Sequence, residues 1–380
     1  MHIHSLSILL ISLVVSATSC ATKQAQSLPR LSQTIDQFHR PESVVFSLDG
    51  KTLFVGNCAS DLFGPDRKLV GMVKGEGAIS KLSVSPEGNV VVQDLKFIEG
   101  LNSPLGLAVM PQSTDEIPRG TLLVNQGITL LVSQSGEPVT DARALGTGVK
   151  LFDPSSGSEL GSIELGVGSR VAEIIGHPLL LPNSLAFDSE GNLFITDTAK
   201  GGDRQVPPQP ANPGLIRITS KALDLLVAGR GEAVTASDVS FLSMPGVPNG
   251  VGYWPAQDAI CVVTMGGEAP EGTAIYQIPA TSFPRRDLPE PWLGNVGTAD
   301  GVAFTPAGTV ITSRFAGDLL AIPRRGNPFP LNVPALVAPA DHRLLTLADG
   351  SSILAVPEQA RTEPKPWSQR VRIIRIPEDF

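Results

Sequence analysis

The chain of 380 residues has few aromatic residues, three cysteines and no cluster of positive charge. Phe, Trp and Tyr make up only 5% of the sequence, whereas there are 38 glycines and 33 prolines. This balance favours many short strands joined by tight turns. Lys and Arg number 29 against 37 Asp and Glu, which gives a formal net charge of −8. An acidic chain without a Lys/Arg cluster argues against nucleic acid as a partner.

The few cysteines also argue against a thiolate metal site. Cys20 belongs to the N-terminal segment, and neither Cys58 nor Cys261 has a second cysteine at metal-ligand spacing. These two fall in the first and fourth of six repeats, on opposite sides of the predicted ring, so a disulfide between them is not expected. We interpret both as small, buried apolar residues.

The apolar run at residues 6–15 is too short to span a bilayer. Small residues follow it up to Cys20, which predicts an export signal over residues 1–20 and a polar tether over residues 21–35. The end of the signal resembles the lipobox of bacterial lipoproteins, in which Cys20 would be lipidated. His2 and His4 in place of Lys or Arg, and Ala17 in place of Leu, depart from that pattern. A plain secretory signal is the alternative, and both place the protein at the bacterial cell envelope, lipid-anchored or periplasmic.

Six segments follow one plan: a short apolar run, a polar turn and a second apolar run. In the clearest, runs at 185–187 and 193–195 flank a turn at 188–192. This pattern predicts an antiparallel hairpin, whose chain returns to the end where it began. The other five hairpins are predicted at 41–57, 104–125, 248–264, 299–313 and 340–356.

Each hairpin is followed by a third strand-like run. These runs are 78–84, 148–152, 214–218, 273–278, 317–322 and 370–376. Six copies at spacings of about 40 to 80 residues predict an all-β fold over residues 36–380, a six-bladed β-propeller with four-stranded antiparallel blades around a central channel. Residues 32–38 are expected to close the ring by joining the last blade.

Oxygen-bearing side chains recur where the first strand of each hairpin begins. The first strand of every blade lines the channel, so equivalent positions converge at one mouth. The six positions are Glu42, Leu105, Asn183, Asn249, Asp300 and Asp341. A ring of carboxylates and carboxamides predicts a site for a hard divalent cation, most naturally Ca²⁺. Taken singly, each Asn or Asp also fits an ordinary turn former.

The pattern of Glu42, Asn183, Asn249 and Asp300 resembles the senescence marker protein/gluconolactonase family, with which paraoxonases and diisopropyl fluorophosphatases are related. The motifs PESVVFSLDGKTLFVGN, LPNSLAFDSEGNLFITDT and ADGVAFTPAG are similar to that family's repeats. The resemblance implies that Glu42, Asn249 and Asp300 are metal ligands and that Asn183 is a ligand or contacts substrate. It also implies that Asp300 is the general base or nucleophile.

The remaining candidate residues lie around the same mouth. By the resemblance, His342 sits where fluorophosphatase-like proteins place a histidine. His177 is a conceivable paraoxonase-like base, although an incidental loop histidine is the preferred interpretation. Asp341 accompanies His342 as a residue near the substrate. Three residues at the ends of second strands are expected to support the metal ligands: Asn57, Asn125 and Asp197.

Two functions from different classes are consistent with this pattern. The first is a metal-dependent hydrolase of a lactone or related ester, in which Ca²⁺, Zn²⁺ or Mn²⁺ polarises the carbonyl. The second is a non-catalytic envelope propeller that binds a ligand or protein partner. The expected partner is a small-molecule substrate, with membrane contact only through the lipid anchor, and the expected state is a monomer.

Overall fold

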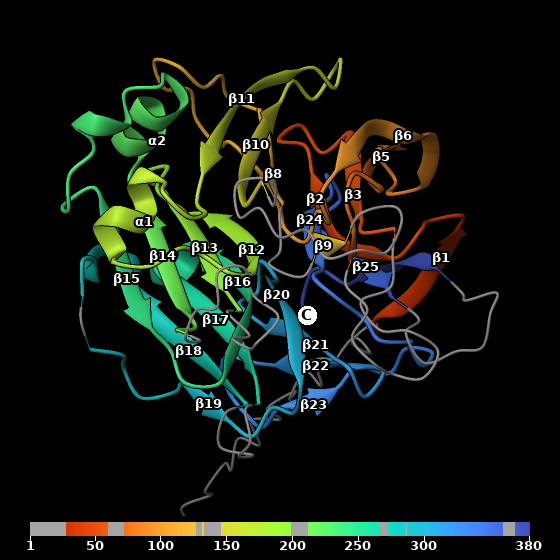
Figure 1. Cartoon of the computed structure of the whole chain (residues 1–380). Coiled ribbons are helices and arrows are strands. Elements are labelled where there is room, and N and C mark those ends of the chain that lie inside the picture. The colour runs from red at the N-terminus through yellow and green to blue at the C-terminus, as the bar shows by residue number, and fades with distance from the viewer. Residues whose placement is uncertain are drawn as a thin grey trace, which may run out of the picture.

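In the computed structural model, the described residues are 28–59, 72–126, 131–132, 146–198, 212–266, 273–285, 287–359 and 369–380. They form six four-stranded antiparallel sheets around a common centre, which confirms the predicted six-bladed propeller (Figure 1). The predicted signal over residues 1–20, with Cys20, lies outside the described residues. Of the predicted tether, the structure describes only residues from 28 onward.

The blades follow the order of the chain, and each inner strand comes first in its blade. Blade 1 consists of β2 (Pro41–Phe46), β3 (Thr52–Asn57), β5 (Gly77–Val84) and β6 (Val90–Leu101). Blade 2 consists of β7 (Leu107–Val109), β8 (Leu122–Gln126), β10 (Gly148–Phe152) and β11 (Glu159–Glu164). Blade 3 consists of β12 (Pro182–Phe187), β13 (Leu193–Asp197), β14 (Gly214–Ile218) and β15 (Val239–Ser243).

The second half of the ring has the same organisation. Blade 4 consists of β16 (Val247–Trp254), β17 (Ala259–Met265), β18 (Ala274–Pro279) and β19 (Leu293–Gly294). Blade 5 consists of β20 (Ala299–Phe304), β21 (Val310–Arg314), β22 (Asp318–Ile322) and β23 (Phe329–Pro330). Blade 6 consists of β24 (Arg343–Thr346), β25 (Ser352–Glu358), β26 (Arg370–Ile376) and β1 (Arg30–Asp36).

Few elements lie outside the blades. The helices α1 (Arg170–Ile175) and α2 (Ser220–Val227) are short, and β4 (Met72–Val73) pairs in parallel with β9 (Leu131–Val132). Among the described residues, no helix has the length and apolar character needed to cross a membrane. The six predicted hairpins and six third strands all form, with boundaries shifted by a few residues.

The core is divided among the six interfaces between neighbouring blades. Because side chains alternate along a strand, one strand contributes to two interfaces. Leu53 and Val55 of β3 pack against blade 6, whereas Phe54 between them packs against blade 2. Cys58 and Cys261 are both fully buried, which confirms the interpretation of these residues as small, buried side chains. Burial raises the pKa of Cys261 to about 12, so its thiol stays protonated.

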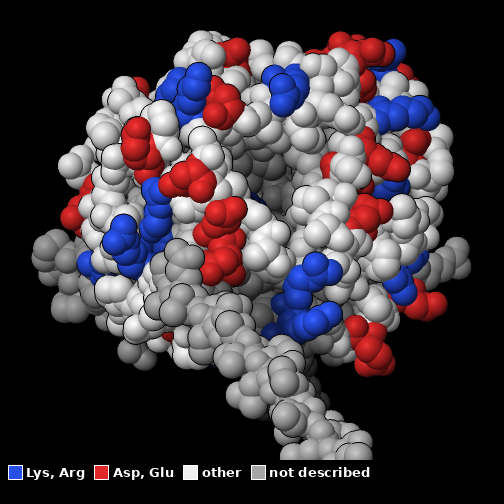
Figure 2. Space-filling view, turned by 180° about the vertical axis from the view of Figure 1, so that it is seen from behind, with Lys and Arg blue, Asp and Glu red and all other residues white. Residues whose placement is uncertain are grey.

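The central channel is partly hollow. A cavity of about 360 Å³ is lined by the inner strands of all six blades, past the ring positions toward the ends of those strands. Figure 2 shows one face of the molecule, where acidic and basic side chains are interspersed around a central hollow. The charges on this face do not form a continuous field of one sign, in keeping with the small net charge of the chain.

The ring is closed by strand β1, which pairs antiparallel with β26 (Figure 1). The first strand in the sequence is therefore the outer strand of the last blade. Gln33 also bonds the blade 1 backbone, donating to the Val90 carbonyl at 2.6 Å and accepting from the Val90 amide at 3.0 Å. This confirms the expected latch but corrects its boundary, because the sheet begins at Arg30, inside the segment expected to be a tether.

We expect Ile35→Ala to loosen this latch. Ile35 is the buried residue of β1 and packs with Phe38 and Val371, so the substitution should lower the free energy of unfolding by about 2 kcal/mol. Thr34→Ala on the exposed side of the same strand is the control and should change it by less than about 0.5 kcal/mol. Thermal unfolding followed by circular dichroism compares the two. Equal stability would show that β1 does not hold the ring closed.

Candidate functional site

The ring residues lie in backbone irregularities of the inner strands. The register of pairing shifts between Pro41 and Ser43, between Pro182 and Leu185, between Pro248 and Val251, and between Ala299 and Val302. Glu42, Asn183, Asn249 and Asp300 fall inside these shifts. Bulges of this kind free a residue from the alternation of a strand and re-aim its side chain. The four residues predicted to hold a metal therefore share a local geometry that sequence reasoning did not foresee.

Two of the four are buried carboxylates. Glu42 is 3% exposed and Asp300 is 1% exposed, a degree of burial that carboxylates reach only with compensating partners. The Gln359 side-chain amide donates to Glu42 Oε2. Gln359 comes from the end of β25 in blade 6, far from Glu42 in sequence, and no local sequence signal indicated it. In blade 2 the same position is occupied by apolar Leu105, as the sequence states.

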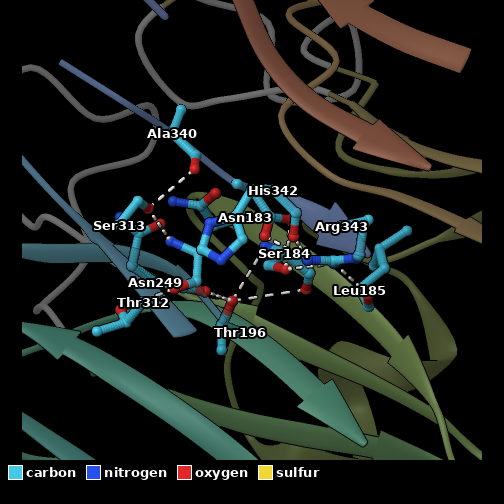
Figure 3. Close-up of polar contacts among 12 residues, drawn as sticks. Asn183, Ser184, Leu185, Thr196, Asn249, Thr312, Ser313, Ala340, His342 and Arg343 are labelled. Atoms are coloured by element: carbon cyan, nitrogen blue, oxygen red, sulfur yellow. Dashed lines mark hydrogen bonds and ion pairs between the residues drawn. The ribbon is translucent and has the colours of Figure 1, made fainter. Parts of the chain in front are cut away.

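The other two ring residues, Asn183 and Asn249, are carboxamides. Asn183 Nδ2 donates to Thr198 Oγ1 at 3.0 Å, and this contact fixes the orientation of the amide. Asn249 Oδ1 is buried and has no hydrogen-bond partner among the described residues. A buried carbonyl oxygen left in this state costs free energy unless a ligand or ion meets it. Figure 3 shows Asn183 and Asn249 within one polar group of side chains.

This set of donors fits a hard divalent cation. Two carboxylates would balance two positive charges, and two neutral amide oxygens would add coordination without further charge. The described residues contain no group of three or more His, Cys, Asp or Glu arranged to hold a metal ion. The four candidate donors are all oxygen atoms, which suit Ca²⁺ better than Zn²⁺, a metal that favours nitrogen and sulfur ligands.

Glycine lets neighbouring inner strands meet at this level. A Cβ atom on Gly106 would lie 2.0 Å from the carbonyl oxygen of Asn183, and one on Gly250 would lie 2.1 Å from that of Asp300. No side chain fits at either distance, so each glycine allows the next blade's ring residue to approach. Gly250 directly follows Asn249, so ring residue and spacer are adjacent in the sequence.

Asp341 has the ring position in blade 6, but both of its oxygen atoms are occupied. Oδ2 accepts from Ser184 Oγ at 2.9 Å, and Oδ1 is paired with Arg343 Nη1. Burial raises the pKa of Asp341, while Arg343 and Ser184 lower it. The side chain is thus committed to these two partners. Sequence reasoning missed Arg343, although a spacing of two residues along a strand places both side chains on one face.

His342 is fully buried and held in one tautomer. Its Nε2 lies 3.1 Å from the Ile311 carbonyl oxygen, which can only accept, so Nε2 carries the proton. Nδ1 keeps its lone pair and has no hydrogen-bond partner within the described ranges. Burial, and after it the charge of Arg343, lowers the pKa of His342 to about 4. The ring is neutral at pH 7.

His177 lies in the loop before β12 and contacts other residues through both ring nitrogens. Nδ1 is 3.2 Å from the Pro178 carbonyl oxygen, and Nε2 is 2.9 Å from Asn212 Nδ2, an amide donor. The lone pair is therefore on Nε2 and is used by Asn212. The ring also packs edge-on against Phe241, with centroids 4.6 Å apart. In this arrangement His177 has no nitrogen ready to accept a proton.

Residues at the ends of second strands brace the loops that lead into the inner strands. Asn57 Oδ1 accepts from the His39 amide at 3.2 Å, and Asn125 Oδ1 accepts from the Gly106 amide at 2.6 Å. Asp197 accepts from two consecutive amides, those of residues 180 and 181, at 3.0 and 2.7 Å. These side chains support the ring by fixing the backbone just before it.

No protein-family model matches the chain, and no curated protein sequence does so either. Solved structures do resemble it over nearly its whole length. A gluconolactonase from Xanthomonas campestris is 14% identical with a TM-score of 0.50, and the match covers 93% of this chain and 96% of that one. Regucalcin from Agrobacterium tumefaciens, described as a calcium-binding protein, is 11% identical with a TM-score of 0.51 and coverages of 91% and 95%.

The structural neighbours are not confined to one reaction. An oxidoreductase (glucose dehydrogenase) from Thermus thermophilus is 15% identical with a TM-score of 0.54 and coverages of 91% and 99%. At these identities the likeness shows the fold, and gluconolactonase-like propellers are among its neighbours, as the repeats predict. Function has to be argued from the site itself.

We expect His342 to make stability depend on pH. Its pKa is about 4 in the folded protein and 6.5 in the reference state, so the unfolded chain binds more protons between these values. The contribution of His342 to the free energy of unfolding is therefore fully present above pH 6.5. It is lost as the pH falls toward 4, and the loss is at most about 3 kcal/mol. The raised pKa of Asp341 acts in the opposite direction. Comparison of His342→Gln with wild type separates the contribution of His342 from that of Asp341.

His342→Gln cannot be protonated and should lose less stability than wild type between pH 7 and pH 4.5. Denaturant unfolding at several pH values, with chelator present, measures this difference. His177→Gln makes the same substitution in a partly exposed loop and is the matched control for the loss of a histidine side chain. Parallel curves for wild type and His342→Gln would mean that the buried ring does not control acid stability.

Proposed function

We propose that the protein is a metal-dependent hydrolase of a lactone or related ester. The observation that supports this most directly is the ring of Glu42, Asn183, Asn249 and Asp300. They occupy one bulged register on four inner strands, and Asn249 Oδ1 has no hydrogen-bond partner among the described residues. A turn former on the surface would bond its own backbone, whereas the buried Asn249 Oδ1 makes no such bond among the described residues.

In this proposal, Glu42 and Asp300 supply the charged oxygens that hold a divalent cation, and Asn183 and Asn249 supply the neutral ones. Ca²⁺ is the best match to four oxygen donors, and the calcium-binding regucalcin has the same fold. When bound, such an ion supplies Lewis-acid stabilisation of negative charge on a carbonyl oxygen. Chain residues supply the rest of the chemistry.

Asp300 is the residue to which we assign proton transfer. It is buried and its side chain is a carboxylate, so it can accept a proton from the attacking water and return it to the leaving oxygen. His177 is a weaker choice because its accepting nitrogen already bonds Asn212. Thr198 orients the Asn183 amide, and Gln359 orients Glu42, so neither ligand has to reorganise when substrate arrives.

Chelation tests the proposal as a whole. Removal of divalent metal should abolish hydrolysis of simple lactones, and added Ca²⁺ should restore it. Unfolding temperature measured alongside shows whether the metal-free protein stays folded. A calcium-loaded protein that is inert on lactones, aryl esters and organophosphates would instead favour the non-catalytic binding function.

Asp300→Asn separates the ligand role from the proton-transfer role. The amide keeps an oxygen in place but removes one of two charges, so Ca²⁺ affinity should fall by at least tenfold. Turnover should stay low even at saturating metal, because an amide is not a base. Asn183→Asp, which adds charge at the same site, should keep or tighten Ca²⁺ binding. Calorimetric titration and lactone turnover are measured on both.

Asp287→Asn is the matched control, since it makes the same change at an exposed position between blades 4 and 5. It should leave both Ca²⁺ affinity and turnover unchanged. If Asp300→Asn binds Ca²⁺ as tightly as wild type and this control, Asp300 is an ordinary residue at a strand start. The proposed site would then have to be abandoned.

A further inference from the structure

A tie of Ser184, Asp341 and Arg343 crosses the central channel. Neighbouring inner strands contact one another around the ring, so blade 3 with Ser184 faces blade 6 with Asp341 and Arg343. Ser184 Oγ donates to Asp341 Oδ2 at 2.9 Å. Figure 3 shows Arg343 beside Ser184, where Arg343 Nη2 donates to Ser184 Oγ at 3.2 Å. Because Ser184 and Asp341 belong to opposite blades, their hydrogen bond directly joins the two sides of the channel.

The tie continues into the two carboxamides of the candidate metal site. The Ser184 amide donates to Thr196 Oγ1 at 3.0 Å, and the Thr196 hydroxyl donates to the carbonyl oxygen of Asn249. Asn183, directly before Ser184, bonds Thr198, whose hydroxyl donates to the Pro248 carbonyl at 2.9 Å. Blades 6, 3 and 4 are thus joined by buried hydrogen bonds that run beside Asn183 and Asn249.

Burial of the charged Asp341 and Arg343 side chains costs desolvation free energy. A role in fixing the geometry of the site would account for their presence. The Asp341 side chain is 2% exposed and that of Arg343 is 17% exposed, so both have lost most of their hydration. A buried ion pair is often no more stable than apolar residues of similar volume, and its best-attested advantage is a defined geometry. Charge-assisted hydrogen bonds in a dry interior are also short and directional.

We propose that Asp341, Arg343 and Ser184 are positioning residues that hold Asn183 and Asn249 in place for the cation, and that Asp341 is not itself a ligand. This rests on the proposed function, in which those two amides bind the metal. Both Asp341 oxygens are engaged by Ser184 and Arg343, whereas Asn249 Oδ1 has no hydrogen-bond partner in the described part of the chain. Loss of the tie should therefore weaken metal binding without removing any ligand.

Ser184→Ala distinguishes positioning from ligation. It removes one hydroxyl and leaves every carboxylate in place, and it should weaken Ca²⁺ binding about tenfold in calorimetric titration. If Asp341 were a ligand held in reserve, releasing it from Ser184 would keep or tighten the affinity. Arg343→Lys keeps the charge but loses the forked contact, and it should weaken binding to a smaller degree. It also serves if Ser184→Ala does not fold.

Ser352→Ala is the matched control, because Ser352 is equally buried and its hydroxyl lies 3.3 Å from the Thr346 hydroxyl, at the turn that joins β24 and β25. It should lower thermal stability but leave Ca²⁺ affinity unchanged, which separates general destabilisation from positioning. Wild-type affinity in Ser184→Ala would overturn the positioning role alone, because wild type would still bind the ion. If wild type binds no Ca²⁺, the proposed function and this role in it both fail.

Discussion

The close approach of inner-strand backbones at one level of the channel is the constraint on which the site depends. Gly106 and Gly250 permit it, since any side chain there would collide with the carbonyl of the following blade's ring residue. Six strands that converge this tightly bring residues from distant repeats to one place. The convergence also forces polar groups into a buried volume. Hydrogen bonds with Thr196, Thr198 and Gln359 and the ion pair with Arg343 hold these polar groups in one defined arrangement.

The fold was accessible to sequence reasoning because its signal is local and repeated. In the segment around Leu185 and Ile195, alternating apolar residues and a polar turn specify a hairpin without reference to the rest of the chain. Six copies then specify the ring. The candidate ligands were accessible for the same reason, since Glu42 and Asp300 each follow a strand start at the same place in the repeat. Their roles in catalysis stay predictions.

The contacts that could not be predicted join residues of different repeats. Gln359 reaches Glu42 across the closure of the ring, and Ser184 reaches Asp341 across the channel, so neither pair has a recognisable spacing in the sequence. Sequence reasoning placed Asp341 and Asp300 at the same position of the repeat, and it assigned the metal only to Asp300. The structure separates them, because Arg343 follows only Asp341 and binds it. The bulges were missed as well, since no glycine or proline pattern marks all four of them.

The pairing of β1 with β26 has a consequence for how the chain reaches its native state. Ser32 bonds the Ile373 carbonyl, a separation of 341 residues, whereas each of the first five blades is built from neighbouring segments. Strand β1 is synthesised first, but it cannot pair until β26, the last strand, has emerged from the ribosome. Until then β1 exposes Ile35 and an unsatisfied backbone edge, the kind of segment that pairs wrongly with other chains. Because closing so long a loop costs conformational entropy, we expect ring closure to be a late step of folding, at which a chaperone that shields strand edges would have most effect.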